Sequence, residues 1–219
     1  MKKYLDILKN CPLFEGIEDS ELLSMLHCLG AKVESFDKKY TVLPEGAKAK
    51  HIGIVLSGSV QIIQIDFYGN RSILGNIGRS DMFAEAFACA ELDSMPVTVV
   101  ANEPSEIMLI SSNHILHTCA NNCGHHRQLI FNIMKDLARK TIGFHQKIDI
   151  ISKRTTRDKL LTYLMIEAKR SGSDSFEIQY DRQELADFLE VERSGLSAEI
   201  SKLRKEGVLE SNKKWFKLL

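Results

Sequence analysis

Residues 181–207 read DRQELADFLEVERSGLSAEISKLRKEG, and this stretch decides the fold of the C-terminal part of the chain. Asp181 is followed three residues later by Glu184, which is the spacing of a capping box. In that motif each of the two side chains bonds the other residue's backbone N–H at the start of a helix. The sequence therefore predicts a short helix after Asp181 that breaks near Glu190, followed by a second helix.

The second helix of this stretch has two unlike faces. Leu196, Ile200 and Leu203 recur at helical spacing and share one apolar face, while the opposite face carries small polar side chains. Residues 208–218 read as a short β-hairpin behind it. Two short helices, a tight turn and a β-wing form a winged helix-turn-helix, in which the second helix enters the major groove of DNA.

Candidate DNA contacts follow from this motif. Arg193 lies in the first turn of the second helix, where a guanidinium can bind O6 and N7 of guanine together. Small neighbours let the helix backbone approach the bases, and lysines at the wing suit phosphates. Double-stranded DNA is therefore the expected partner. The predicted DNA-binding residues are Arg193, Ser194, Ser197, Ala198, Ser201, Gln183, Lys202, Lys213 and Lys214.

Charge and composition set outer limits on the function. The 219 residues carry 29 Lys and Arg against 29 Asp and Glu, so the formal net charge is zero. Residues 202–219 nevertheless hold six Lys and Arg against two Glu, an excess of four. No apolar run is long enough to span a membrane, and Met1-Lys2-Lys3 precedes no signal-peptide core. We therefore expect a cytoplasmic protein without membrane contact.

Residues 31–112 change from helical spacing to short β-rich runs separated by turn residues. Turns about ten residues apart, with no long helices between the runs, predict a β-roll, barrel or sandwich. A cupin-like enzyme is the alternative for such a fold. Its metal site needs clustered histidines, and this region contains only His51. We therefore expect no enzyme, and neither a metal nor another cofactor.

A helical period returns over residues 125–150, and its narrow apolar stripe is typical of a coiled-coil seam. The sequence thus predicts an α+β chain in three parts. These are a β-roll sensor domain with flanking helices (1–124), a dimerisation helix and hinge (125–152) and a winged helix-turn-helix (153–219). The alternative for the long helix is packing on its own domain. The predicted dimer-interface residues are Leu129, Ile133, Leu137, Phe144 and Ile148.

These motifs resemble the Crp/Fnr family, the relatives of the cyclic-AMP receptor protein, over nearly the whole chain. The resemblance is carried by residues 181–186 (DRQELA), 193–197 (RSGLS), 54–60 (IVLSGSV) and 81–86 (DMFAEA). It implies a homodimeric transcription regulator with a cyclic-nucleotide-binding-like jelly roll. In such a regulator an effector in the roll repositions the DNA-binding domains, and RNA polymerase is a candidate partner.

This chain departs from the family pattern at several positions, and these departures change what we expect of its effector and of its helix-turn-helix. The glycine of the phosphate cassette is Ala84 here, and its Arg-Ser pair is Met95-Pro96, so cyclic AMP is not the expected effector. The usual turn glycine is Glu190, so a left-handed turn would place a non-glycine residue at positive φ. By carry-over from the family, the predicted effector pocket comprises Phe83, Glu85, Met95, Thr98, Leu137 and Thr141.

Two further alternatives stay open on sequence grounds. Cys119 and Cys123, followed by His125 and His126, form the one metal-like group among five scattered cysteines, although reduced structural thiols are the commoner case. The second alternative is functional, namely a non-catalytic small-molecule or nucleotide sensor that acts through protein partners. DNA affinity separates that sensor from a regulator.

Overall fold

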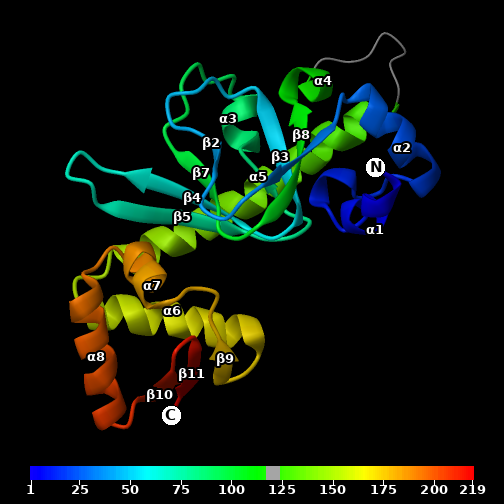
Figure 1. Ribbon diagram of the computed structural model, residues 1–219. Helices are drawn as coiled ribbons and strands as arrows, with labels where there is room; N and C mark the ends of the chain where they lie inside the picture. Colours follow the sequence, from blue (N-terminus) through cyan, green and yellow to red (C-terminus); the bar gives the residue numbers. More distant parts are fainter. Residues whose placement is uncertain (117–123) are drawn as a thin grey trace. The chain divides into compact units, whose positions relative to one another are not determined.

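The computed structural model describes residues 1–116 and 124–219 (Figure 1). The chain forms two compact units, one from Met1–Gly69 and Leu74–Thr141, the other from Asn70–Ile73 and Ile142–Leu219. The predicted β-roll, long helix and C-terminal winged helix-turn-helix are all present. None of the helices in these described ranges has the length and apolar character needed to cross a membrane.

Two four-stranded sheets form the roll. β3 of the first sheet is buried on both faces: Ile52, Ile54 and Leu56 belong to one buried cluster and Val55 to another, which also holds Val60 and Val99 of the second sheet. The first sheet has the order β1 (Lys32–Phe36), β8 (Ser105–Ser111), β3 (His51–Ser57) and β6 (Met82–Phe83). The second has the order β2 (Thr41–Leu43), β7 (Thr98–Ala101), β4 (Val60–Ile65) and β5 (Arg71–Ile77).

Short helices cover the first sheet of the roll on the side away from the second. Leu8, Leu13, Leu22 and Leu26 from these helices pack with Ile110 of β8 in one buried cluster. The helices are η1 (Lys2–Tyr4), α1 (Leu5–Leu8), η2 (Pro12–Phe14), α2 (Asp19–Cys28), α3 (Glu85–Cys89) and α4 (Ser112–Leu116).

The long helix α5 (Gly124–Ile151) packs one face on this cluster. Leu129 and Ile133 are buried there, and the Asn132 amide donates to the carbonyl oxygens of Leu13 and Glu15, both at 2.8 Å. The prediction that Leu129 and Ile133 face a second copy therefore needs correction. Both side chains are already covered by the chain's own roll and are not available to another molecule.

Another face of α5 exposes large apolar side chains. Phe131, Met134 and Ile142 are 54%, 57% and 61% exposed. Of the predicted stripe, Leu137 is half-buried against the roll core, whereas Phe144 and Ile148 are exposed. At 100° per residue, Phe131, Met134 and Ile142 fall within one 80° sector, so they form a continuous apolar seam along the helix.

The C-terminal unit packs three helices on a small sheet. Tyr163, Tyr180 and Phe188 form an aromatic cluster in its core, with ring centroids 4.8–6.3 Å apart. The helices are α6 (Thr156–Ser171), α7 (Arg182–Leu189) and α8 (Arg193–Lys205). The antiparallel sheet has the order β10 (Leu209–Asn212), β11 (Trp215–Leu218) and β9 (Ser175–Glu177), and the sequence predicted only its β10–β11 hairpin.

Gly53 tests how tightly the roll is packed. It lies opposite Phe83 across the β3–β6 pair, and a Cβ at position 53 would overlap the buried Phe83 ring. We expect Gly53→Ala to lower the free energy of unfolding by about 1–3 kcal/mol, as overpacking does elsewhere. Gly75→Ala in β5, where a Cβ meets open space, is the matched control and should cause no loss. Urea unfolding followed by circular dichroism measures both, and equal effects would contradict this account.

Candidate nucleic-acid interface

The start of α7 is fixed by the predicted capping box. The Glu184 backbone N–H donates to the Asp181 carboxylate at 2.9 Å, and the Asp181 N–H donates to the Glu184 carboxylate at 2.8 Å. Both bonds satisfy donors that a helix start leaves free. The first helix of the motif therefore begins at Arg182, as the sequence predicts.

The turn between α7 and α8 is left-handed at Glu190, with φ 54° and ψ 58°. The sequence analysis expected that, if this turn is left-handed, the non-glycine residue Glu190 has a positive φ, and the structure confirms it. Lys159 of α6 donates to the carbonyl oxygens of Leu189 and Glu190, each at 3.2 Å. The ammonium satisfies carbonyls that the end of α7 leaves without helical partners, so α6 stabilises the turn.

Helix α8 buries its apolar face and exposes its small one. Leu196, Ile200 and Leu203 are at most 4% exposed. Ser194, Ala198, Ser201 and Lys202 are exposed, while Ser197 is half-buried. Arg193 is also exposed and makes no hydrogen bond or ion pair with any residue that the structure describes. The helix thus presents a small-residue face with a free guanidinium at its beginning.

Arg157 of α6 binds two carboxylates, that of Glu199 in α8 and that of Glu206, which directly follows α8. Its guanidinium bonds Glu199 at 3.3 Å and Glu206 at 2.7 Å. The hydrogen bond to Arg157 is the main cause that lowers the pKa of the Glu206 carboxyl below its usual value. Two of the acidic groups in this region are therefore paired with a cation rather than left to oppose an anionic ligand.

The remaining predicted contacts differ in how free they are. Lys213 is exposed at the wing tip, where it holds φ 52°. The Lys214 ammonium donates to the Gln179 carbonyl at 2.7 Å, and the Gln183 amide donates to Asp187 at 2.8 Å. Lys213 is thus the freer cation of the wing, whereas Lys214 and Gln183 must share their donors with the protein.

Sequence reasoning missed Arg182, the first residue of α7. Its guanidinium lies 5.7 Å from the Phe216 ring centroid, and its Nη1 is buried without a hydrogen-bond partner. Burial and then the like charge of Arg193 lower the pKa of Arg182. Arg182 and Arg193 each begin a helix, where the partial positive charge of the helix N-terminus also favours an anion. The signal available in the sequence was the arginine directly after an N-cap.

Four of the predicted effector-pocket residues lie in the roll, and the other two, Leu137 and Thr141, lie on α5. Phe83 and Met95 are 1% exposed in its core. The Glu85 carboxylate is 2.9 Å from the Lys140 ammonium, and the Thr98 hydroxyl accepts a bond from the Glu45 N–H at 3.3 Å. Leu137 is half-buried, and Thr141 is exposed with its hydroxyl bonded to its own helix. Glu85 is therefore the one acid among the six, and it is already paired.

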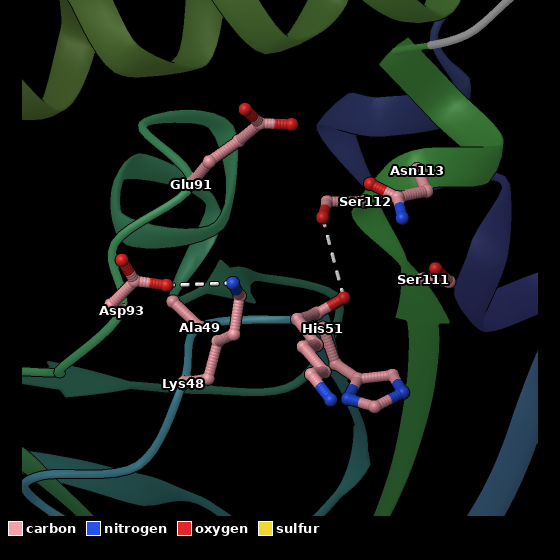
Figure 2. Close-up of a pocket in the computed structure, with 9 residues that line it drawn as sticks. Lys48, Ala49, His51, Glu91, Asp93, Ser111, Ser112 and Asn113 are labelled. Atoms are coloured by element: carbon pink, nitrogen blue, oxygen red, sulfur yellow. Dashed lines mark hydrogen bonds and ion pairs between the residues drawn. The ribbon is translucent and has the colours of Figure 1, made fainter.

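A hollow of about 460 Å³ on the roll lies among Lys48, Glu91, Asp93 and Asn113 (Figure 2). Lys48 and Asp93 form an ion pair at 2.6 Å. Figure 2 shows the labelled polar side chains spread around the rim instead of pointing to one spot. None of the six predicted pocket residues lines this hollow, so it offers no support for an effector there.

Two family models match this chain. Residues 33–122 match the cyclic nucleotide-binding domain, and residues 158–219 match the Crp-like helix-turn-helix domain. The chain belongs to the Crp/Fnr family. That family consists of transcription regulators. The matched ranges cover the roll strands from the second residue of β1 onward, and the C-terminal unit from the third residue of α6 through α8.

A curated Crp/Fnr relative is the CRP-like cAMP-activated global transcriptional regulator of Mycobacterium tuberculosis (strain CDC 1551 / Oshkosh). It is 29% identical over 106 residues, which are 48% of this chain and 45% of the relative. The chain thus spans about half the length of the curated relative it matches.

Two solved structures are similar to this chain in fold. The c-di-GMP responsive regulator CLP of Xanthomonas campestris has a TM-score of 0.74 at 19% identity, over 90% of this chain and 98% of that chain. FixK2 of Bradyrhizobium japonicum has a TM-score of 0.67 at 17% identity, and the match covers 86% of this chain and 92% of that chain.

The metal-like group that the sequence points to consists of Cys119, Cys123, His125 and His126. Cys119 and Cys123 lie outside the described residues. Among the residues that are described, no three His, Cys, Asp or Glu side chains come together as a metal site. Burial raises the pKa of the Cys11 thiol to about 12, which keeps it protonated and unreactive at neutral pH.

The left-handed turn of this Crp/Fnr chain yields a prediction about stability. A non-glycine residue in that conformation costs about 1–2 kcal/mol, partly offset by the greater entropy of glycine in the unfolded chain. We expect Glu190→Gly to raise the free energy of unfolding by about 0.5–1 kcal/mol. Fluorescence of Trp215, the single tryptophan, reports on this unit. Glu190→Ala removes the charge but keeps the strain, and an equal gain from it would refute the explanation.

Proposed function

We propose that the chain is a homodimeric, sequence-specific DNA-binding transcription regulator of the Crp/Fnr type that acts in the cytoplasm. The observation that carries the proposal is the exposed small-residue face of α8 with the unpaired Arg193 in its first turn. A helix used only for packing has no need of such a face. A helix that must bring its backbone close to base edges requires small residues there.

We assign the contacts that read DNA bases to α8 and the contacts to DNA phosphates to cations on and around that helix. Arg193 reads guanine through O6 and N7, and the methyl group of Ala198 can contact a thymine methyl. The cations of Arg182, Lys202 and Lys213 bind phosphates, which position the helix without reading the sequence. The family's usual glutamate and second arginine are Ser194 and Ala198 here, so we infer a half-site different from the usual one.

Homodimerisation is supported by the exposed seam on α5. Phe131, Met134 and Ile142 are large apolar side chains, each more than half exposed along one helix. Such a stripe on a helix of 28 residues is typical of a surface that pairs with its own copy. Two copies would then present two α8 helices to half-sites about one turn of DNA apart, ~34 Å.

An anionic cyclic nucleotide is a poor effector for this roll. The positions of the family's Arg-Ser pair are Met95, which is buried in the apolar core, and Pro96. A phosphodiester would enter without a guanidinium partner, and losing one partner of a buried charge pair costs about 2–5 kcal/mol. We therefore propose that cyclic AMP does not control this regulator.

DNA binding is tested with a sequence recovered from a random pool on the wild-type protein. We expect Arg193→Ala to weaken binding to that sequence by about 1–3 kcal/mol and to relax the preference at one base pair. Lys213→Gln should weaken selected and unrelated DNA alike and lower the salt slope by about 1 per subunit. Fluorescence anisotropy at several salt concentrations measures both effects.

Lys169→Gln is the matched control for these DNA measurements. Lys169 is an exposed lysine of α6, twelve residues and therefore about 18 Å further along that helix than Arg157. Its replacement removes the same charge and should leave the affinity unchanged. If the wild-type protein binds no DNA at any salt concentration, the chain is instead a sensor that acts through protein partners.

The dimer is tested by sedimentation. We expect the wild-type protein to sediment at twice the chain mass of 24.8 kDa, because the α5 seam buries its apolar side chains between copies. Met134→Glu places a charge in that seam and should give monomers. Tyr40→Glu, at a residue 59% exposed on the roll, should stay dimeric. A Met134→Glu protein that remains a dimer would place the interface elsewhere.

A further inference from the structure

Three charged side chains meet inside the roll unit, two from α5 and one from the first residue of α3. The Lys140 ammonium lies 2.9 Å from Oε1 of Glu85 and 2.8 Å from Oδ2 of Asp136. It also donates to the Met82 carbonyl oxygen at 2.8 Å. One lysine of α5 is therefore bonded to its own helix and to two groups of the roll segment 82–85.

Burial makes this cluster unlike an ordinary surface ion pair. The side chains of Glu85 and Asp136 are only 5% and 9% exposed, and that of Lys140 is 27% exposed. Burial alone would lower the pKa of Lys140, but the charges and hydrogen bonds of the two carboxylates outweigh it and raise the pKa. The ammonium is therefore held charged between two acids that have left bulk water.

The backbone at Ala84 gives the cluster its geometry. Ala84 is left-handed, with φ 63° and ψ 3°, and directly precedes α3. This turn lets the Met82 carbonyl and the Glu85 carboxylate face the same point, where the ammonium lies. Oε2 of Glu85 is buried and has no hydrogen-bond partner. The segment thus forms an acceptor site shaped for a primary ammonium, with one acceptor still unused.

We propose that Lys140 is a built-in ligand of the roll: its ammonium occupies the acceptor site of Met82 and Glu85 and so holds α5 on the roll with no effector bound. The occupant's chemistry is that of a primary alkylammonium, opposite in charge to a nucleotide phosphate. A second consequence depends on the proposed function. The regulator binds its DNA without any added effector, because the position of α5 needs none.

Lys135 offers a matched control on the same helix. It lies five residues before Lys140 and pairs with Glu15 at 2.6 Å. Its side chain is 37% exposed and that of Glu15 is 50% exposed, so this pair stays in contact with water. The two lysines therefore differ in the burial of their partners, and only Lys140 reaches the acceptor site.

Chemical rescue tests the proposal directly. Lys140→Ala removes Cγ, Cδ, Cε and Nζ, the four heavy atoms that propylammonium supplies. We expect the variant to melt below the wild-type Tm and to regain Tm in a saturable manner as propylammonium is added. Tetramethylammonium carries the same charge without an N–H donor and should give no such gain. Wild-type protein and Lys135→Ala should show none with either salt.

The proposal is overturned if Lys140→Ala responds equally to both salts, or if Lys135→Ala is rescued as well. Should Lys140→Ala not fold, a double-mutant cycle takes its place. The drop in Tm caused by Lys140→Met should shrink when Glu85→Gln is already present, because one of the two buried carboxylates that Lys140→Met leaves unpaired is then neutral. Additive losses would show that the two side chains do not act together.

DNA affinity tests the second consequence separately. With DNA selected on the wild-type protein, we expect Lys140→Ala to bind at least fivefold more weakly and to recover with propylammonium, whereas Lys135→Ala changes less than twofold. If Lys140→Ala binds DNA as well as wild type, the ammonium does not control the regulator. If the wild-type protein binds no DNA, the proposed function fails, while the thermal rescue still decides whether Lys140 is a ligand.

Discussion

The burial of Leu196, Ile200 and Leu203 is the constraint on which the C-terminal unit depends. Each buried aliphatic side chain contributes about 1.5–3 kcal/mol, so turning α8 about its axis would forfeit several kilocalories per mole. The opposite face must therefore stay exposed. The Lys159 bonds at the preceding turn and the Arg157 bonds at the far end hold α8 at both ends, so the exposed face has one orientation within its unit.

Local patterns allowed this unit to be predicted from the sequence. The capping box and the break near Glu190 involve residues at most four positions apart, and both occur where the sequence placed them. Helix α5 shows where such reasoning ends. Its periodicity predicts an apolar face correctly, but spacing does not tell whether the chain's own roll or another molecule covers that face. Leu129 and Ile133 therefore lie in the roll core.

The features that could not be predicted from the sequence depend on contacts between residues that are far apart along the chain. Lys140 and Glu85 are 55 positions apart, and neither has a neighbour that marks it as one of a pair. The strand β9 has only three residues and pairs with β11 forty positions later, so no alternation is long enough to reveal it. Such features become visible only when the folded backbone brings the segments together.

The charge balance has a consequence for how this molecule would meet a polyanion. With 29 residues of each sign, the protein as a whole is neither drawn to nor driven from a DNA cylinder at long range. Only at separations near the Debye length, ~8–10 Å, does the uneven placement of charge become effective. At that distance the electrostatic field of the DNA rotates the protein more than it attracts it. The rotation brings the excess of cations in residues 202–219 toward the phosphates. Productive encounters would then be limited by rotation, not by capture from afar.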